Sequence, residues 1–388
     1  MSVLRVGTAL SQSGMYARQG QQALQGLRLW VDETNAQGGL FVPECHRAVA
    51  LQLIAYDDRS RRRDVEQVTE RLISVDGVDF LIGPYSSGLA HAAATIAEAH
   101  QKALWNHGGS SDAIMRQGFR WSVHLPTPAS GYFAGLFSCL RSQGAGAGPV
   151  AIVQRLRGTF STEVAAGVRQ HAERSDFPIL PPFFYPTDPD DSGHMSALAE
   201  ALAAATPAVI IAIGRYEDDV ALLRQLAETS LDAVVVVAVA APMQEFRRDL
   251  QEIAAGCVGP SQWESGPQAS VDVGPSSATF VERFRQRFGQ SPDYPAAQAY
   301  AAGLILQRCV LLAITCTDAG LRAAADRLAC RTFYGDFRLD AASGQQVGHE
   351  TVLVQWQGDE KKVIWPAGLA EAGLIKIHSG LGRKMRRS

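Results

Sequence analysis

Residues with hydroxyl groups directly follow two short apolar segments, 78–82 and 103–105, that we predict to be buried strands. The first strand is followed by Tyr85, Ser86 and Ser87, and the second by His107, Gly108, Ser110 and Ser111. In open α/β sheets, ligands bind beyond the carboxyl ends of the strands. Free N–H groups and the positive dipole end at a helix start favour a carboxylate or another acceptor. The spacing therefore predicts a small-molecule site, with Ser87 at the start of a helix.

Several of these residues also have structural interpretations that stay open. Ser87 can be a plain helix N-cap, a role that is compatible with ligand binding. Gly108 lets the backbone approach a ligand closely, but His107 beside it can equally be a packing or tight-turn residue. Ser110 and Ser111 offer hydroxyl and backbone donors at the next helix start.

The chain alternates between strand and helix patterns from its beginning. In the first half we predict strands at 3–10, 49–56, 78–82 and 103–105 and helices at 20–35, 64–75 and 87–100. The pattern then restarts, with helices at 129–141, 162–175, 195–205 and 217–228 and strands at 150–154, 208–213 and 233–240. Repeated strand–helix units imply parallel sheets covered by helices on both faces. The predicted fold class is α/β, with two Rossmann-like parallel-sheet lobes.

Three non-helical stretches are candidates for crossovers between the lobes, namely residues 123–128, 258–263 and 333–339. Further helices are predicted at 279–288, 295–315 and 319–329, and strands at 351–356 and 363–365. These stretches predict one lobe from 1–123 plus 262–334 and a second from 124–261 plus 335–366. Residues 367–388 are predicted to be a basic tail.

The order of several motifs resembles that of the periplasmic leucine/isoleucine/valine-binding proteins, the type I solute receptors of ABC importers. The motifs that carry the resemblance are Ser11-Gln12-Ser13-Gly14, Asn35-Ala36-Gln37-Gly38-Gly39, Tyr56-Asp57-Asp58, residues 78–87, Pro292-Asp293-Tyr294-Pro295-Ala296 and Tyr300-Ala301-Ala302. The resemblance covers residues 3–365. Cytosolic amide sensors and the ligand domains of some membrane receptors share this fold.

The resemblance implies two α/β lobes joined by a three-strand hinge, closing around one small molecule. It implies a ligand-binding serine at Ser87, with Ser86 beside it, and places carboxylate-binding groups at Gly108 and Ser110. It also implies aromatic contacts from the second lobe, at Tyr216 and near Phe160. Aromatic walls supply contact area to a ligand, so Tyr16 and Tyr294 are further candidates at the mouth of the site, each with core packing as the alternative.

One position departs from the family pattern. Leucine-type receptors pair an acidic residue of the second lobe with the ligand's ammonium group, and here that position falls near the apolar Ala240-Ala241-Pro242. A buried ammonium group without an anion would cost several kcal/mol. Either Glu217, Asp218 or Asp112 replaces the missing carboxylate, or the ligand is an amide, carboxylate or aromatic acid without an α-ammonium. The family's early disulfide is also missing, since 56–59 has no nearby cysteine.

Composition and motifs argue against other classes of protein. Net charge is −3 and pI about 6.3, which gives no general attraction to nucleic acid. The longest apolar run, 233–242, is far below the ~18 residues that span a bilayer. The sequence has no G-x-S-x-G, H-E-x-x-H or P-loop motif, and its glycine-rich 144–148 precedes a predicted strand instead of following one. We therefore expect no enzyme activity, no metal and no cofactor.

The six cysteines form no C-x-x-C motif, and we expect most to be buried, with a Cys316–Cys330 bridge left open.

The expected function is the substrate-binding component of an ABC importer, with permease subunits as partners and no nucleic acid. The N-terminal residues lead straight into the first predicted strand without a recognisable signal peptide. We expect a periplasmic protein if a leader was trimmed or mis-assigned. The alternative is a cytoplasmic ligand-sensing regulator of the amide-sensor type.

Overall fold

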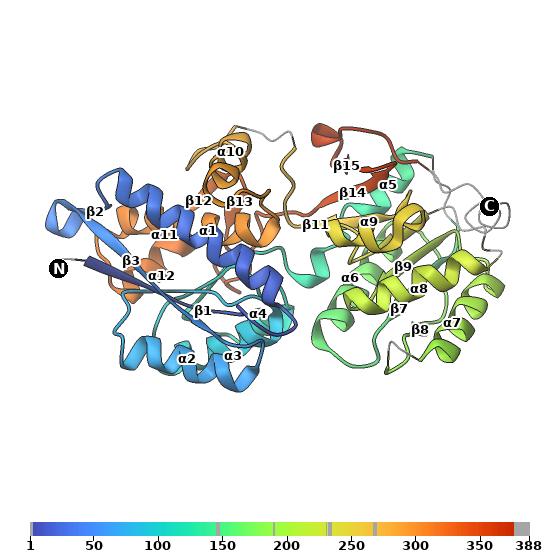
Figure 1. Cartoon of the computed structure of the whole chain (residues 1–388), viewed down its shortest axis with the longest axis horizontal. Helices are drawn as coiled ribbons and strands as arrows, with labels where there is room; N and C mark the ends of the chain where they lie inside the picture. Colours follow the sequence, from blue (N-terminus) through green and yellow to red (C-terminus); the bar gives the residue numbers. More distant parts are fainter. Residues whose placement is uncertain are drawn as a thin grey trace. The chain divides into compact units, whose positions relative to one another are not determined.

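The computed structural model describes residues 3–144, 148–188, 191–229, 231, 235–266 and 270–375 (Figure 1). The chain divides into two compact units. Unit 1 comprises Met1–Pro128 and Gln262–Glu350, and unit 2 comprises Ala129–Ser261 and Thr351–Ser388. The chain therefore passes between the units three times, after Pro128, Ser261 and Glu350.

Unit 1 is built on a sheet with the strand order β2-β3-β1-β4-β5-β6. Its strands are β1 (Val3–Leu10), β2 (Leu40–Val42), β3 (Arg47–Asp57), β4 (Phe80–Ile82), β5 (Leu104–Asn106) and β6 (Ser122–His124). All are parallel except β2, which runs antiparallel to β3. The helices are α1 (Ala17–Ala36), α2 (Arg62–Ser74), α3 (Ser87–Ala99), α4 (Asp112–Arg116), α10 (Ser277–Phe288), α11 (Tyr294–Ala313) and α12 (Asp318–Arg327), with a 3-10 turn at Pro43–Cys45. A separate hairpin joins β12 (Ala329–Thr332) to β13 (Gly335–Arg338).

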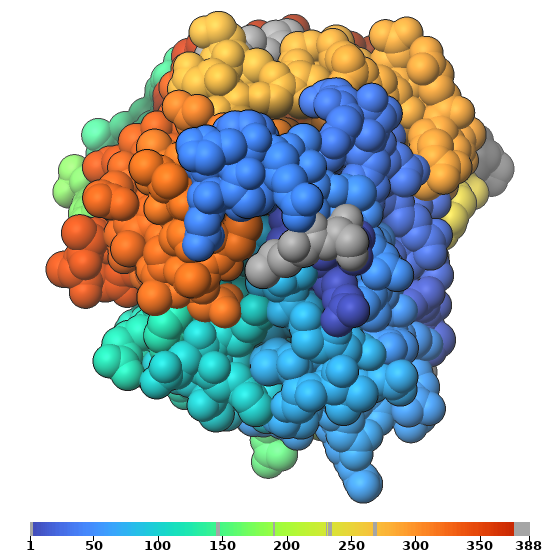
Figure 2. All heavy atoms as spheres, turned by 90° about the vertical axis from the view of Figure 1, so that its left-hand side faces the viewer, coloured from blue at the N-terminus to red at the C-terminus, as the bar shows by residue number. Residues whose placement is uncertain are grey.

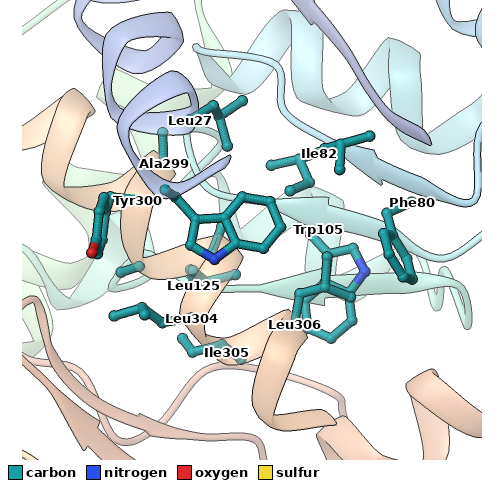
Figure 3. Packing of buried hydrophobic residues seen from close by; sticks show 14 of the residues in the cluster. Leu27, Phe80, Ile82, Trp105, Leu125, Ala299, Tyr300, Leu304, Ile305 and Leu306 are labelled. Carbon is teal, nitrogen blue, oxygen red and sulfur yellow. The ribbon is translucent and has the colours of Figure 1, made fainter. Parts of the chain in front are cut away.

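Helices cover both faces of this sheet, as the apolar strands require. One face packs on α1, α10, α11 and α12, and the other on α2, α3 and α4. Figure 3 shows the first face, where Leu27 of α1 and Leu306 of α11 lie among Phe80, Ile82 and Trp105 of the strands. On α1, the residues at helical spacing that face the sheet are all buried, namely Ala23, Leu27, Trp30, Val31 and Thr34.

Unit 2 repeats the plan with the strand order β15-β14-β11-β10-β9-β7-β8. Its strands are β7 (Val150–Gln154), β8 (Phe183–Phe184), β9 (Val209–Ile213), β10 (Val235–Ala238), β11 (Val258–Ser261), β14 (Val352–Gln357) and β15 (Glu360–Trp365). The first five of these in chain order are parallel, and β14 and β15 extend the sheet antiparallel. The helices are α5 (Leu136–Ser142), α6 (Thr159–Arg174), α7 (Ser192–Ala204), α8 (Tyr216–Glu228) and α9 (Gln244–Leu250), with 3-10 turns at Ala129–Gly131, Gln251–Ala254 and Ala367–Leu369.

The α/β class with two parallel-dominated sheets is confirmed, but three local predictions are wrong. Residues 129–141 form a 3-10 turn and then a separate helix whose N-cap is Gly135, where the backbone packs on the indole of Trp365: a Cβ there would lie 2.5 Å from the ring. The third crossing is not at 333–339, because β13 pairs with β12 inside unit 1, so residues 335–350 stay in that unit. The expected tail does not begin at 367, since Ile375 exchanges two hydrogen bonds with the side chain of Gln355.

Helix α11 is long and apolar enough to cross a membrane by length and composition, although its apolar residues do not form one continuous run. Of its most apolar window, 72% is buried in the structure, as in the core helix of a globular unit. Helix α11 also contacts β2, and Figure 2 shows the face of the molecule that carries this end of unit 1. All six cysteines are free, so the Cys316–Cys330 bridge is absent.

Candidate functional site

The loops after β4 and β5 are joined at the carboxyl edge of the unit 1 sheet. Tyr85 forms a parallel bridge with Gly108, and the backbone N–H of Ser86 donates to the Gly108 carbonyl at 3.2 Å. The N–H of Ser111 donates to Oγ of Ser87 at 3.1 Å. Ser86 and Ser87 thus meet Gly108 and Ser111, as expected from adjacent strand ends. Ser110, next to Ser111 in the sequence, is 95% buried.

Gly108 is required here by its neighbour in the other loop. A Cβ on Gly108 would lie 2.7 Å from the Cα of Tyr85, so a side chain would push the two loops apart. The glycine therefore permits close approach between two backbones.

Ser86 has an unusual backbone conformation. Its φ of 78° and ψ of 146° fall close to a region that only glycine adopts easily. Ser86 is also the N-cap of α3, where its Oγ accepts a long hydrogen bond of 3.5 Å from the N–H of Leu89. Such strain is concentrated at ligand-binding and active sites, so it supports a functional role for this loop.

Three predicted aromatic residues meet beside this loop. The Tyr85 ring lies edge-on to Tyr16, with centroids 5.8 Å apart, and 6.4 Å from the Tyr294 ring. The hydroxyls of Tyr85 and Tyr294 are hydrogen-bonded to each other. Tyr16 immediately precedes α1 and Tyr294 begins α11, so the three rings come from segments far apart in the chain. All three are half-buried, and together they form a tyrosine cluster at the edge of unit 1.

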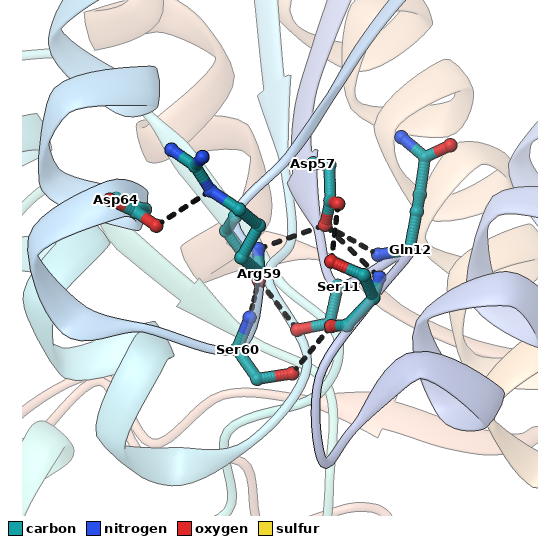
Figure 4. Close-up of polar contacts among 8 residues, drawn as sticks. Ser11, Gln12, Asp57, Arg59, Ser60 and Asp64 are labelled. Atoms are coloured by element: carbon teal, nitrogen blue, oxygen red, sulfur yellow. Dashed lines mark hydrogen bonds and ion pairs between the residues drawn. The ribbon is translucent and has the colours of Figure 1, made fainter.

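A polar network after β1 and β3 fixes the loop that carries Tyr16 (Figure 4). Asp57 accepts hydrogen bonds from Gln12 N at 2.8 Å and from Ser13 Oγ at 2.7 Å. Ser60 Oγ donates to the Ser13 carbonyl at 2.9 Å and accepts from Tyr16 N at 3.0 Å. Burial alone would raise the pKa of Asp57, but the hydrogen bonds from Ser13, Arg59 and Gln12 outweigh it and lower the pKa. The motifs at 11–14 and 56–58 thus have a structural explanation: they position Tyr16.

His107 is buried inside unit 1 and is not exposed at the carboxyl edge of the sheet. Its side chain is fully buried, and burial lowers its pKa to about 4, so the ring is neutral at pH 7. Neither ring nitrogen has a hydrogen-bond partner among the described residues. The neighbouring Asn106 instead holds the loop, accepting from Gly109 N at 2.8 Å and donating to the Gly109 carbonyl at 2.7 Å. The packing interpretation of His107 therefore fits this burial.

Unit 2 places Tyr216 and Phe160 at the carboxyl ends of β9 and β7, which are neighbouring strands. Tyr216 begins α8 and donates from its hydroxyl to Asp249 at 2.6 Å. Phe160 lies edge-on to Tyr132, with centroids 5.3 Å apart. The two residues pack against different apolar clusters, one on each face of the sheet.

Two buried carboxylates beside Tyr216 are already engaged within unit 2. Asp218 pairs with Arg155 at 2.6 Å and accepts from Arg215 N at 2.8 Å. Asp219 accepts from the hydroxyl of Tyr185 at 2.7 Å, from Gly214 N at 2.8 Å and from Ala240 N at 3.1 Å. Burial raises the pKa of Asp219 to about 7.

Arg155 was not among the predicted site residues, because 63 positions separate it from its partner Asp218 and it belongs to no recognisable motif. Asp218 is fully buried and held by Arg155, so it is a poor candidate for an ammonium partner. The apolar corner is confirmed as buried at Ala240 and Ala241. In the described part of the chain, no group of three His, Cys, Asp or Glu side chains is arranged to hold a metal ion.

The profile of the family described as periplasmic binding protein matches residues 3–361, which is most of the chain. The chain belongs to this family. Among curated relatives, Leu/Ile/Val-binding protein homolog 8 of Brucella abortus (strain 2308) is 24% identical over 241 residues, 60% of this chain and 57% of the relative. Homolog 7 of the same strain is 29% identical over 131 residues, 34% of this chain and 31% of the relative. These matches thus span about a third to somewhat over half of the relatives' length.

Solved structures of solute-binding proteins show the same fold along nearly the whole chain. The branched-chain amino acid transporter substrate binding protein LivJ from Streptococcus pneumoniae, in complex with isoleucine, has a TM-score of 0.77 and 18% identity, covering 97% of this chain and 99% of that one. The solute binding protein of an ABC transporter from R. palustris, in complex with benzoate, has a TM-score of 0.74 and 19% identity, covering 96% and 99%. At these identities the likeness establishes the type I periplasmic-binding-protein fold.

Proposed function

We propose that this protein is the substrate-binding component of an ABC importer and that it binds a small molecule carrying a carboxylate or a comparable acceptor group. The observation that carries the proposal is the junction of the β4 and β5 loops beside the tyrosine cluster, where Ser86 bonds Gly108 and Ser87 bonds Ser111, the neighbour of Ser110. Hydroxyl and N–H donors at the start of α3 favour an acceptor, because the helix dipole is positive there. Family membership supports transport over catalysis. The proposed partners are permease subunits and the proposed compartment is the periplasm.

The ligand body is proposed to be uncharged or aromatic, without an α-ammonium. Three nearby carboxylates, Asp112, Asp218 and Asp219, are buried. Asp218 is paired with Arg155, and Asp219 already accepts hydrogen bonds from Tyr185, Gly214 and Ala240. Glu217 is exposed at the start of α8 and is the remaining candidate. The tyrosine cluster offers aromatic faces and hydroxyl groups, which suit a ring better than a branched aliphatic chain. Relatives of both kinds exist, one crystallised with isoleucine and one with benzoate.

A calorimetric competition series tests the ligand class. Leucine is compared with 4-methylpentanoate, which lacks only the amino group, and with benzoate. We expect at least one of the two acids without an ammonium to bind more tightly than leucine. Leucine binding ten times more tightly than both would show that an anion, Glu217 first, receives the ammonium.

The same titrations test the site in Ser110→Ala and Ser87→Ala variants. Each removes a hydroxyl expected to bond a charged group, worth roughly 1.5–3 kcal/mol, so affinity should fall about one to two decades. Thr95→Ala on the exposed side of α3 serves as control, because its hydroxyl bonds only within the helix, to the carbonyl of His91. Parental affinity in both serine variants would mean that the site is elsewhere.

A further inference from the structure

The three segments at which the chain leaves or re-enters unit 1 are joined by buried side chains of that unit. Thr127 lies one residue before the first crossing, Gln262 begins unit 1 again after the second, and His349 lies one residue before the end of the third segment. All three side chains are at least 95% buried. These three side chains are joined to one another's segments by hydrogen bonds whose donors and acceptors can be assigned.

Gln262 pairs with the backbone of Thr127 as a neighbouring strand would. Its Oε1 accepts from Thr127 N at 3.1 Å and its Nε2 donates to the Thr127 carbonyl at 3.2 Å. Because a backbone N–H only donates and a carbonyl only accepts, the orientation of the amide is fixed. This pair joins the first crossing to the second.

His349 joins the third crossing to the first. Its Nε2 lies 3.1 Å from the carbonyl of Tyr334, which can only accept, so Nε2 carries the ring proton. Burial lowers the pKa of His349 to about 4, so the ring is neutral. The Thr127 hydroxyl lies 2.6 Å from the acceptor Nδ1 of the ring and 3.0 Å from the His349 carbonyl, and it can donate its proton to either. The ring also stacks on Tyr334 at 4.2 Å.

Tyr334 extends this network to the helix that carries Tyr294. Its hydroxyl donates to Oε1 of Gln262 at 2.8 Å and accepts from Nε2 of Gln298 at 2.9 Å. Gln298 lies one helical turn after Tyr294 in α11, on the same side of the helix. A continuous chain of hydrogen bonds therefore runs from Gln298, one turn into α11, to all three crossings.

We propose that Gln298, Tyr334 and Gln262 are positioning residues that make the three crossing segments respond as one unit to the first turn of α11. The link to Tyr294 as a ligand contact rests on the proposed function; the tie among the crossings does not. Any displacement of the start of α11 is transmitted to all three segments together, because they share the Gln262–Thr127–His349 bonds.

Hydrogen–deuterium exchange on the full-length protein tests the tie without any ligand. Tyr334→Phe removes the bridging hydroxyl, leaves Nε2 of Gln298 without its acceptor and keeps the stacked ring. Exchange should rise together, about five- to twentyfold, in peptides covering 124–128, 260–263 and 347–350. Tyr300→Phe is the matched control, since Tyr300 lies on the same helix and bonds Glu33 instead; exchange in those peptides should be unchanged. A change confined to one segment, or equal changes in variant and control, overturns the proposal.

A second pair of variants keeps the test open if Tyr334→Phe folds poorly. Thr127→Val removes the hydroxyl that bonds His349, and Thr127→Ser retains it. We expect the valine variant to loosen the first and third segments together and the serine variant to restore them; identical exchange in both would also overturn the proposal.

A further experiment adds benzoate or leucine to the parent and to Tyr334→Phe, after calorimetry shows which one binds. Protection of all three segments in the parent alone is expected, and equal protection in both proteins would overturn the link to α11. If neither probe binds, the proposed function fails on that count while the ligand-free result still decides the tie.

Discussion

Ser86 combines a strained backbone with a weak helix cap, and this combination can be tested at a single residue. Replacing it with glycine should stabilise the protein by about 1–3 kcal/mol through relief of backbone strain. Two losses oppose this gain: a few tenths of a kcal/mol from the lost cap and roughly 0.5–1 kcal/mol from the greater freedom of glycine in the unfolded chain. Replacing it with alanine keeps the strain and loses the cap at about 1 kcal/mol. Urea unfolding should therefore rank Ser86→Gly at or above the parent and Ser86→Ala below it. An alanine variant more stable than the glycine variant would contradict a positive φ at this position.

Other single residues differ in how far the sequence could define their roles. Ser87 and Gly108 could be placed together because parallel strands end at one edge of a sheet. The role of Gly108 against Tyr85 could not be seen, since it depends on a backbone contact across two loops. The burial of Asp218 under Arg155 is likewise a long-range fact.

At the scale of helices, the packing of α1 on α11 depends on glycine. A Cβ on Gly26 would lie 2.2 Å from the Ala296 carbonyl oxygen, a backbone atom that cannot rotate away. Gly26→Ala should therefore force the helices apart and destabilise the protein by several kcal/mol, as overpacking of a core does. Gly88 in α3 is the matched control, because a Cβ there meets nothing within 4 Å. Gly88→Ala should be neutral or stabilising by about 0.5–1 kcal/mol. Thermal unfolding of both variants measures the contrast, and equal melting temperatures would contradict the close packing.

Elements with strong local patterns were predictable, and those decided by distant contacts were not. Helix α1 follows from the spacing of Ala23, Leu27 and Trp30, and β1 matches its predicted bounds. Strand β2 was missed because it has only three residues and is defined by its antiparallel pairing with β3. The close packing of Trp365 on Gly135, the N-cap of α5, could not be seen either, because more than two hundred positions separate the two residues in the sequence. The third crossing was misplaced because long-range contacts keep 335–350 in unit 1: β13 pairs with β12, Gln346 bonds the Leu125 carbonyl and His349 bonds Thr127.

On the scale of the whole molecule, buried titratable groups are unevenly divided between the units. Unit 1 contains His107 and His349, whose pKa values burial lowers to about 4, and His124, whose pKa it lowers to about 3. Unit 2 contains Asp219, whose pKa burial raises to about 7. Two weaker shifts oppose these: burial raises the pKa of Asp58 in unit 1 and lowers that of His171 in unit 2.

These shifts predict that acid destabilises unit 1 before unit 2. Below pH about 6.5, the pKa of a histidine in the unfolded chain, His107, His124 and His349 bind protons when unfolded but stay unprotonated in the native state. The free energy of unfolding then falls by roughly 1.4 kcal/mol per group for each pH unit down to about 4. Asp219 acts in the opposite direction, because native Asp219 holds its proton between about 3.8 and 7 while the unfolded residue is ionised. Stability from Asp219 is therefore present at low pH and is lost as the pH rises through 7.

Hydrogen exchange at pH 7.5 and pH 5, corrected for intrinsic rates, should show protection falling in β1, β4 and α11 more than in β7, β9 and α8. A His107→Leu variant removes one of the three groups, so its unfolding free energy should depend on pH less steeply than the parent's by about a third of the histidine contribution. This test of His107→Leu holds even if the variant is less stable overall, because it compares how steeply the free energy of unfolding changes with pH and not its absolute value. Loss of protection in unit 2 first, or a parental slope in His107→Leu, would show that these histidines are not buried in the neutral form.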